Sequence, residues 1–261
     1  MLPCMAHGTV AIVSDIHGNL RALQACLDDA AAQGAESIWC LGDVVGYGAR
    51  PLECLAIIRE REAVLIRGNH EQAVLDGPLG FNPLAAAAIE WTRAQLEHGS
   101  PGGEALEYLR GLPERVDTEA AVLVHGSPAS PVDEYLFPED ALDQLPRGLD
   151  YSPKLARCFG LIDRPCFVGH THVPGIITRD MRWTSPADCG GVWETGGLAC
   201  IINVGSVGQP RDGDVRAAYA IFDGETATLR RVPYDVQGTV DEILAVPDLP
   251  DLLAHRLLEG W

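Results

Sequence analysis

The sequence has no long apolar run, and its start does not look like a secretory signal. No stretch approaches the roughly 18 consecutive apolar residues of a membrane-spanning helix. The first eight residues carry neither a basic start nor a long apolar core. We therefore expect a cytoplasmic protein that does not insert into a membrane.

Paired cysteines are also missing, because none of the eight cysteines belongs to a CxxC motif. Several lie in apolar stretches, where a cysteine side chain behaves as a small hydrophobic group. This pattern argues against a disulfide framework and favours a reducing compartment such as the cytoplasm.

Positive charge is scarce, since 37 acidic residues outnumber 19 lysines and arginines and the net charge is −18. Nonspecific binding of nucleic acid depends on lysine and arginine neutralising phosphates, so a nucleic-acid strand is not the expected partner. An anionic substrate needs a local source of positive charge, and bound cations are the obvious one. The length of 261 residues and the 47% hydrophobic content are those of a globular chain with a sizeable core.

The N-terminal half alternates strand-like apolar runs with helical patterns. After the run at residues 9–13, a helix is predicted to start near Asn19, a good N-cap residue. After the run at residues 37–41, Pro51 suits the first turn of the next helix. A third, shorter run covers residues 64–66. This order is typical of βαβ units.

The C-terminal half is richer in strands that follow one another directly. The predicted strands cover residues 121–124, 166–168, 175–178, 199–204, 217–222 and 226–232. Asp223-Gly224 predicts a hairpin between the last two strands, and a short helix is expected near residues 138–145. The two halves together indicate two packed sheets with helices outside.

Residues from about 76 to 111 show a helical pattern and no evident strand. We expect a helical insertion, either a cap over a functional site or ordinary helices packed on a sheet face. It carries Phe81, Trp91 and Tyr108, whose rings either stack on a nucleobase or belong to the core. Residues from about 236 to 261 are expected to form a C-terminal helical tail.

Side chains that commonly bind metals follow five of the predicted strands. They are Asp15, His17, Asp43, Asn69, His70, His125, His170 and His172. Loops after strands are where α/β proteins place their ligands. Asp15 and His17 are two residues apart, so in extended backbone both side chains would point the same way. Imidazole, carboxylate and amide donors without a thiolate favour Mn, Fe, Zn, Ni or Co.

In this order, the motifs resemble the calcineurin-like metallophosphoesterase superfamily. The matching blocks are Asp15-x-His17, Gly42-Asp43, Gly68-Asn69-His70-Glu71, His125-Gly126 and Gly169-His170-Thr171-His172. The resemblance implies an α+β fold, an α/β/β/α sandwich of two mixed sheets flanked by helices, formed by residues 1–261 as one domain. It also implies hydrolysis of phosphate ester or anhydride bonds by a metal-bridging hydroxide.

The resemblance further implies two divalent transition metal ions, with manganese as the first choice. One ion would be held by Asp15, His17, Asp43 and His172. The other would be held by Asp43, Asn69, His125 and His170, with Asp43 bridging. His70 would lie outside both metal shells as the catalytic general acid, near the leaving group.

Two glycine-rich blocks, at residues 42–48 and 205–214, most resemble the bacterial branch related to diadenosine tetraphosphatases. Protein Ser/Thr phosphatases of the superfamily read GDxVDRG, whereas this chain has Gly46 and Tyr47 in place of the second Asp and the Arg. That Asp normally orients the catalytic histidine, and that Arg normally grips phosphate. A protein phosphatase is therefore disfavoured.

Because the second Asp of that motif is missing, Glu71 or a backbone carbonyl would have to orient His70. Arg211 is a candidate phosphate clamp, since a guanidinium can bind two oxygens, or else an ordinary loop arginine. A small phosphorylated substrate is expected, with nucleotides or dinucleoside polyphosphates favoured. The alternatives are a protein Ser/Thr phosphatase-like enzyme and a non-catalytic interaction scaffold with this fold.

Overall fold

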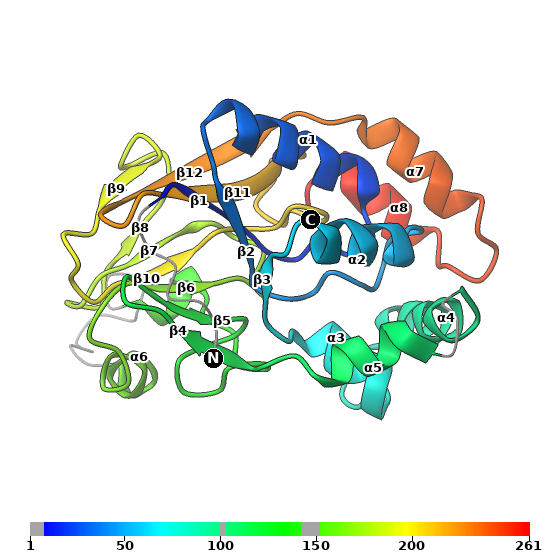
Figure 1. Cartoon of the computed structure of the whole chain (residues 1–261), viewed down its shortest axis with the longest axis horizontal. Coiled ribbons are helices and arrows are strands. Elements are labelled where there is room, and N and C mark those ends of the chain that lie inside the picture. The colour runs from blue at the N-terminus through cyan, green and yellow to red at the C-terminus, as the bar shows by residue number, and fades with distance from the viewer. Residues whose placement is uncertain (1–7, 100–102, 142–151) are drawn as a thin grey trace.

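Short runs of buried β-branched and aromatic residues form the strands, which assemble into two mixed sheets (Figure 1). The structure is a computed structural model, and it describes residues 8–99, 103–141 and 152–261. Within these residues each sheet has six strands, and helices pack on both outer faces. The predicted sandwich of two mixed sheets flanked by helices is confirmed.

The first sheet has the strand order β3-β2-β1-β11-β12-β9. Its strands are β1 (Val10–Val13), β2 (Ser37–Cys40), β3 (Val64–Leu65), β9 (Val192–Glu194), β11 (Ala217–Phe222) and β12 (Thr226–Val232). The strands β1, β2 and β3 are parallel, whereas β11 runs antiparallel to both β1 and β12. The predicted βαβ order and the hairpin at Asp223-Gly224 are confirmed.

The second sheet has the order β4-β5-β6-β10-β7-β8. Its strands are β4 (Arg115–Asp117), β5 (Val122–Val124), β6 (Cys166–Val168), β7 (Gly175–Ile177), β8 (Trp183–Thr184) and β10 (Ile201–Asn203). The parallel strands are β5, β6 and β10. The sequence does not predict β4, β8 or β9, because these two- or three-residue edge strands carry too few buried side chains to form an apolar pattern.

The helices are α1 (Leu20–Ala32), α2 (Pro51–Glu60), α3 (Asn69–Asp76), α4 (Pro83–Gly99), α5 (Glu104–Arg110), α6 (Pro153–Phe159), α7 (Val236–Leu244) and α8 (Leu252–His255). Two of them begin where the sequence predicts, near Asn19 and at Pro51, whereas α3 and α6 are not predicted. Asn19 caps α1, since its Oδ1 accepts a hydrogen bond from the N–H of Ala22 at 3.1 Å. Of the helix expected near residues 138–145, a 3₁₀ turn at Pro138–Asp140 is seen, and residues 142–145 lie outside the described ranges.

Alternate residues of each strand serve two different cores. Ile12 and Trp39 face Phe167 and Ile202 between the sheets, whereas their neighbours face the outer helices. Phe222 packs against Phe167 with ring centroids 5.0 Å apart. Because both faces of each sheet are buried, the ends of the central strands are held in rigid positions.

Helices α4 and α5 fill the range predicted as helical, but their aromatic residues lie in different places. Trp91 packs with the C-terminal helices, and the ring of Tyr108 lies 4.5 Å from the Cζ of Arg59. Phe81 packs against His70, with ring centroids 5.2 Å apart. Of the two alternatives, packing therefore accounts for Trp91 and Tyr108, and Phe81 is the one of the three beside the strand-end residues.

The C-terminal tail is helical as predicted, with a 3₁₀ turn at Arg256–Leu258 after α8. Within the described ranges, no helix is both long and apolar enough to cross a membrane. The cysteines of these ranges are free, and most of them are buried.

Candidate metal centre

The carboxyl ends of parallel strands from both sheets converge at one edge of the sandwich. The N–H of Asp15, after β1, donates to the carbonyl of Gly42, after β2, at 3.1 Å. The N–H of His170, after β6, donates to Asp15 Oδ2 at 2.9 Å. His125 Nδ1, after β5, lies 2.8 Å from the carbonyl of Leu41. Loops from the two sheets are thus bonded directly to each other.

One cluster at this edge consists of Asp15, His17 and His172, and these three buried side chains could hold a metal ion. His172 Nε2 lies 3.1 Å from Asp15 Oδ1 and 3.1 Å from His17 Nε2. His17 Nε2 is 3.8 Å from Asp15 Oδ1. The three donor atoms therefore surround one small volume.

A second cluster consists of Asp43, His125 and His170, which could also hold an ion. His125 Nε2 lies 3.3 Å from Asp43 Oδ2 and 3.1 Å from His170 Nδ1. The amide oxygen of Asn69, in the first turn of α3, is 3.0 Å from the same His125 nitrogen. The structure therefore brings Asn69 to this cluster, as the sequence predicts.

Asp43 lies between the two clusters. Its Oδ2 is 3.3 Å from His125 Nε2 and 3.8 Å from His17 Nε2. The predicted metal ligands thus all meet, and together they are called the candidate metal centre: Asp15, His17, Asp43, Asn69, His125, His170 and His172. One carboxylate oxygen of Asp43 faces both halves of it, the position that a bridging ligand requires.

The hydrogen bonds of the imidazole rings leave nitrogen lone pairs aimed at the centre. His17 Nδ1 lies 3.3 Å from the carbonyl of Val45, and His172 Nδ1 lies 2.5 Å from that of Gln209. Because a carbonyl only accepts, each Nδ1 carries the proton and each Nε2 carries a lone pair. The two Nε2 atoms are 3.1 Å apart, and the nearby Asp15 Oδ1 has no hydrogen-bond partner. A cation between them would relieve this repulsion, so the residues fit a metal.

The electrostatics agree with this arrangement. Burial lowers the pKa of His17, His170 and His172, so these rings are neutral. Burial also opposes the charge of His125, but the nearby carboxylates of Asp43, Asp15 and Glu71 together raise the pKa of His125 to about 10. A proton on His125 thus balances these carboxylates when no cation does, and a metal would displace it.

Left-handed backbone is concentrated in these loops. Positive φ angles occur at Asp15 (53°), His17 (49°), Asp43 (52°), His170 (67°) and His172 (62°). The extended backbone expected for Asp15 and His17 is therefore wrong, and the two side chains meet because each lies in a tight turn. Strained conformations of this kind gather at functional sites, where surrounding packing enforces them.

His70 lies beside the candidate metal centre in the first turn of α3. Its ring is enclosed by those of Tyr47 at 4.4 Å, His17 at 4.5 Å and Phe81 at 5.2 Å between centroids. Its Nε2 is 4.0 Å from Asp43 Oδ2, and its buried Nδ1 has no hydrogen-bond partner. Gly46 has a φ of 91°, and a β-carbon there would collide with Nδ1. Ring packing against a glycine thus positions His70.

Glu71 does not orient His70. Its carboxylate accepts hydrogen bonds from the N–H groups of Asp43, Val44, Val45 and Gly68 at 2.7 to 3.2 Å. The interpretation of Glu71 as the partner of His70 is wrong, because these four donors occupy the carboxylate. Glu71 instead holds the turn that carries Asp43.

A cavity of about 240 Å³ opens beside the centre, and we call it the site cavity. Its lining includes Asn69, Phe81, Asp133, Tyr135 and His170. The ring of Tyr135 stacks on His170 with centroids 3.6 Å apart. The sequence analysis missed Asp133 and Tyr135, because they lie in a loop with no strand-end or periodic signal. Arg211 lies close by, with its N–H donating to the carbonyl of His172 at 3.3 Å.

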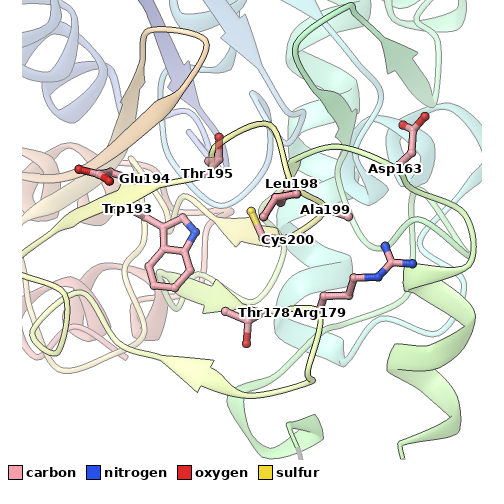
Figure 2. Close-up of a pocket in the computed structure, with 9 residues that line it drawn as sticks. All are labelled: Asp163, Thr178, Arg179, Trp193, Glu194, Thr195, Leu198, Ala199 and Cys200. Carbon is pink, nitrogen blue, oxygen red and sulfur yellow. The ribbon is translucent and has the colours of Figure 1, made fainter.

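A second cavity, of about 370 Å³, lies elsewhere, and we call it the far cavity. Figure 2 shows its lining: Asp163, Thr178, Arg179, Trp193, Glu194, Thr195, Leu198, Ala199 and Cys200. Cys200 precedes β10, and its carbonyl accepts from the N–H of Cys166, the first residue of β6. The far cavity is therefore at the amino ends of these strands, opposite the candidate metal centre.

Comparison with known proteins gives consistent matches. Residues 9–227 match the calcineurin-like phosphoesterase superfamily domain. An uncharacterized protein of Methanocaldococcus jannaschii is 35% identical over 265 residues, covering 98% of this chain and 100% of that protein. The crystal structure of a metallophosphoesterase from Sphaerobacter thermophilus is 39% identical with a TM-score of 0.81, covering 97% of this chain and 100% of that one. The symmetrical bis(5'-nucleosyl)-tetraphosphatase of Neisseria gonorrhoeae is 27% identical over 113 residues, 40% of each chain.

Proposed function

We propose that this chain, which belongs to the calcineurin-like phosphoesterase superfamily, hydrolyses phosphate ester or anhydride bonds of small molecules. The observation that carries the proposal is the pair of buried Asp/His clusters joined by Asp43. Each cluster offers only nitrogen and oxygen donors, as borderline-to-hard divalent ions require. The nearby site cavity provides room for a compact substrate.

In this proposal Asp43 would serve two divalent ions. One ion would be held with Asp15, His17 and His172. The other would be held with Asn69, His125 and His170. When bound, such ions supply charge that stabilises phosphoryl oxygens and lowers the pKa of water. Manganese is the predicted ion, and iron, zinc, nickel and cobalt suit the same donors.

His70 acts in the proposed reaction as a general acid toward the leaving oxygen. Burial lowers the pKa of His70 to about 4, so the free protein holds a neutral ring at neutral pH. The negative charge of a bound phosphate raises that pKa, because it favours the imidazolium form. A bound phosphate therefore favours the protonated ring that a general acid requires.

The proposed substrate class is a nucleotide or a dinucleoside polyphosphate. Phe81 and Tyr135 border the site cavity, and aromatic faces of this kind stack on nucleobases. The similarity to an enzyme named for bis(5'-nucleosyl) tetraphosphates points the same way. A net charge of −18 disfavours a longer polyanion such as a nucleic-acid strand.

Turnover assays with added Mn, Ni or Co test the proposal. The substrates are mononucleotides, cyclic nucleotides, dinucleoside polyphosphates, phosphopeptides and p-nitrophenyl phosphate. We expect turnover of the nucleotide class that EDTA abolishes and added metal restores. Full activity in EDTA would contradict a metal-dependent reaction.

The role of His70 has its own test. His70→Ala should keep its metals and lose kcat by roughly 10²–10⁴-fold. The loss should shrink for p-nitrophenol, a good leaving group that needs little protonation. His98→Ala serves as the matched control, because His98 is an exposed histidine of α4 bonded to its own helix. An equal loss across leaving groups would argue against acid catalysis.

A further inference from the structure

His170 turns a different ring nitrogen toward the candidate metal centre than the other histidines of that centre do. Its Nδ1 lies 3.1 Å from His125 Nε2, whereas its Nε2 lies 3.2 Å from the main-chain carbonyl of Asp133. Because a carbonyl only accepts, Nε2 carries the proton and the lone pair of Nδ1 faces the centre. In His17 and His172 it is Nδ1 that lies beside a carbonyl. The orientation of the His170 ring therefore depends on a separate loop, the one that carries Asp133.

The ring of Tyr135, from the same loop, covers one face of the His170 imidazole. The two ring centroids are 3.6 Å apart and the two planes differ by 19°. Phe137 stacks in turn on Tyr135, with centroids 5.1 Å apart and planes that differ by 7°. The last torsion of a histidine side chain is broad, so an unsupported ring samples a wide range of angles. The stacked Tyr135 ring blocks this rotation, which would move Nδ1 away from the centre.

Tyr135 is held in place by its two neighbours in the chain. Leu136 is only 2% exposed and packs in an apolar cluster with side chains of α6. The carboxylate of Glu134 accepts hydrogen bonds from the Ser127 hydroxyl and from the Arg157 guanidinium, which belongs to α6. These contacts fix the backbone on both sides of Tyr135, although Tyr135 itself is 38% exposed.

The loop of Tyr135 starts at the candidate metal centre, because it follows directly after His125. The N–H of Gly126 donates to the carbonyl of Pro131 at 2.7 Å, which folds the loop back on itself. A β-carbon on Gly126 would meet main-chain atoms of this loop at 3.0 Å or less. The N–H of Gly169 donates to the carbonyl of His125 at 2.9 Å. One loop thus carries one candidate ligand, His125, and supports a second, His170.

We infer that Tyr135 is a positioning residue for His170. Its ring, together with the carbonyl of Asp133, keeps Nδ1 directed at the ion that would be held with His125 and Asn69. The inference rests on the metal centre of the proposed function and adds to it a residue that contacts a ligand and not the ion. Removing a group that orients a metal-binding histidine typically weakens metal binding 10- to 100-fold.

Tyr135 should act on one of the two ions only, because its ring stacks on His170. The cluster of Asp15, His17 and His172 takes its support from elsewhere. The imidazoles of that cluster lie beside carbonyls of the loops after β2 and β10. Loss of the Tyr135 ring should therefore weaken the binding of one ion and leave the other unchanged.

Manganese titration of the metal-free protein tests the inference without turnover. The electron paramagnetic resonance signal of free Mn²⁺ gives the number of bound ions and their dissociation constants. In Tyr135→Leu, one dissociation constant should rise about 10- to 100-fold and the other should change less than twofold. Tyr135→Phe keeps the stacked ring and should bind both ions as the wild type does. Tyr108→Leu removes a ring of α5 that lies against Arg59, and as the matched control it should change neither constant.

Nitrogen-15 NMR of the histidine rings gives a second measurement on the metal-free protein. The wild type and Tyr135→Phe should show His170 with its proton on Nε2. In Tyr135→Leu the shifts of the two ring nitrogens should approach each other, because the ring reorients and both tautomers are populated. The melting temperature of Tyr135→Leu without metal should fall by no more than about 2 °C, since an exposed side chain contributes little to stability.

Three results would overturn the inference. Equal weakening of both ions in Tyr135→Leu would assign Tyr135 a general structural role. Unchanged dissociation constants with a raised KM for nucleotides would make Tyr135 a base-binding residue only. The same loss in Tyr135→Phe would place the effect in the hydroxyl group and not in the stacked ring.

Failure of the proposed reaction would look different. A wild type that binds two ions but hydrolyses no phosphate compound would refute that reaction. Selective weakening of one ion in Tyr135→Leu would still support the positioning role in that case.

Discussion

The site cavity and the far cavity lie at opposite ends of the second sheet, and they differ in chemistry more than in size. The site cavity measures about 240 Å³ and borders His170, Asn69 and the buried clusters. The far cavity is larger, at about 370 Å³, and its lining includes Trp193, Leu198 and Cys200 (Figure 2). Within the described residues, each cluster that could hold a metal lies at the first end. Convergent donors, and not volume, identify a candidate site.

Glycine is needed at the two ends of the second sheet for different physical reasons. A β-carbon on Gly68 would collide with the Asp43 carboxylate, and one on Gly169 would collide with Ser14 and Asp15. Near the far cavity, Gly196 and Gly197 have φ angles of 56° and 71°, but β-carbons there would meet nothing within 4 Å. The metal-facing loops thus need glycine for close approach, whereas the far loops need it only for a turn.

The largest expected effect comes from Asp43→Asn. Both ions should be lost, and kcat/KM should fall about 10³-fold or more, because several kcal/mol of charge stabilisation disappear. Elemental analysis of protein purified without chelator should show nearly two transition metal ions per chain in the wild type. Asp163→Asn at the far cavity is the matched control and should keep both ions. If Asp43→Asn kept both ions, the candidate metal centre would no longer differ from the far cavity in metal binding.

Gly46→Ala tests whether close approach matters at His70. The new methyl group should displace the His70 ring and lower kcat about tenfold to a hundredfold. Gly190→Ala is the control, because its φ is 62° but its surroundings are open. Each substitution should cost about 1–2 kcal/mol of unfolding free energy from the positive φ. If both variants kept wild-type kcat, glycine at position 46 would serve only the turn.

Trp193→Ala tests whether the far cavity matters for stability and not for activity. Removal of this half-buried indole should lower the free energy of unfolding by about 2 kcal/mol. The value of kcat/KM measured well below the melting temperature should stay within twofold of the wild type. A large loss of activity in a folded variant would mean that the far cavity takes part in the reaction.

Asp29, outside both cavities, gives the scale of an ordinary ion pair. Hydrogen bonds from Arg230, at 2.6 and 2.9 Å, lower the pKa of Asp29 in the folded protein. Its stabilisation is therefore complete above its unfolded pKa of about 3.9 and is lost as pH falls through the lower folded value. Asp29→Asn should cost about 0.5–1 kcal/mol between pH 5 and 8. Denaturant unfolding should show this cost shrinking below pH 4, and a constant cost would exclude the pair as its source.

Much of the fold follows from local patterns in the sequence. The strands at residues 10–13, 37–40 and 217–222 are apolar runs of ordinary length, and Asn19 and Pro51 mark helix starts. The shorter edge strands β8 and β9 leave no such pattern, because pairing with a neighbour and not burial keeps them in place.

The candidate ligands are also visible in the sequence, because each follows a strand within a few residues. Their mutual geometry is not, since Asp15 and His170 are bonded across two sheets. The role of Glu71 is likewise set by contacts, because its four donors come from two separate loops.

The sequence by itself determined which residue types follow the strands, because a polar side chain after an apolar run is recognised from neighbouring residues alone. Tertiary structure alone decided that Phe81 and not Trp91 reaches His70, and that Tyr135 stacks on His170. These partners are far apart in the chain. Their proximity depends on how helices and loops pack on the two sheets, and no local pattern of residues records that packing.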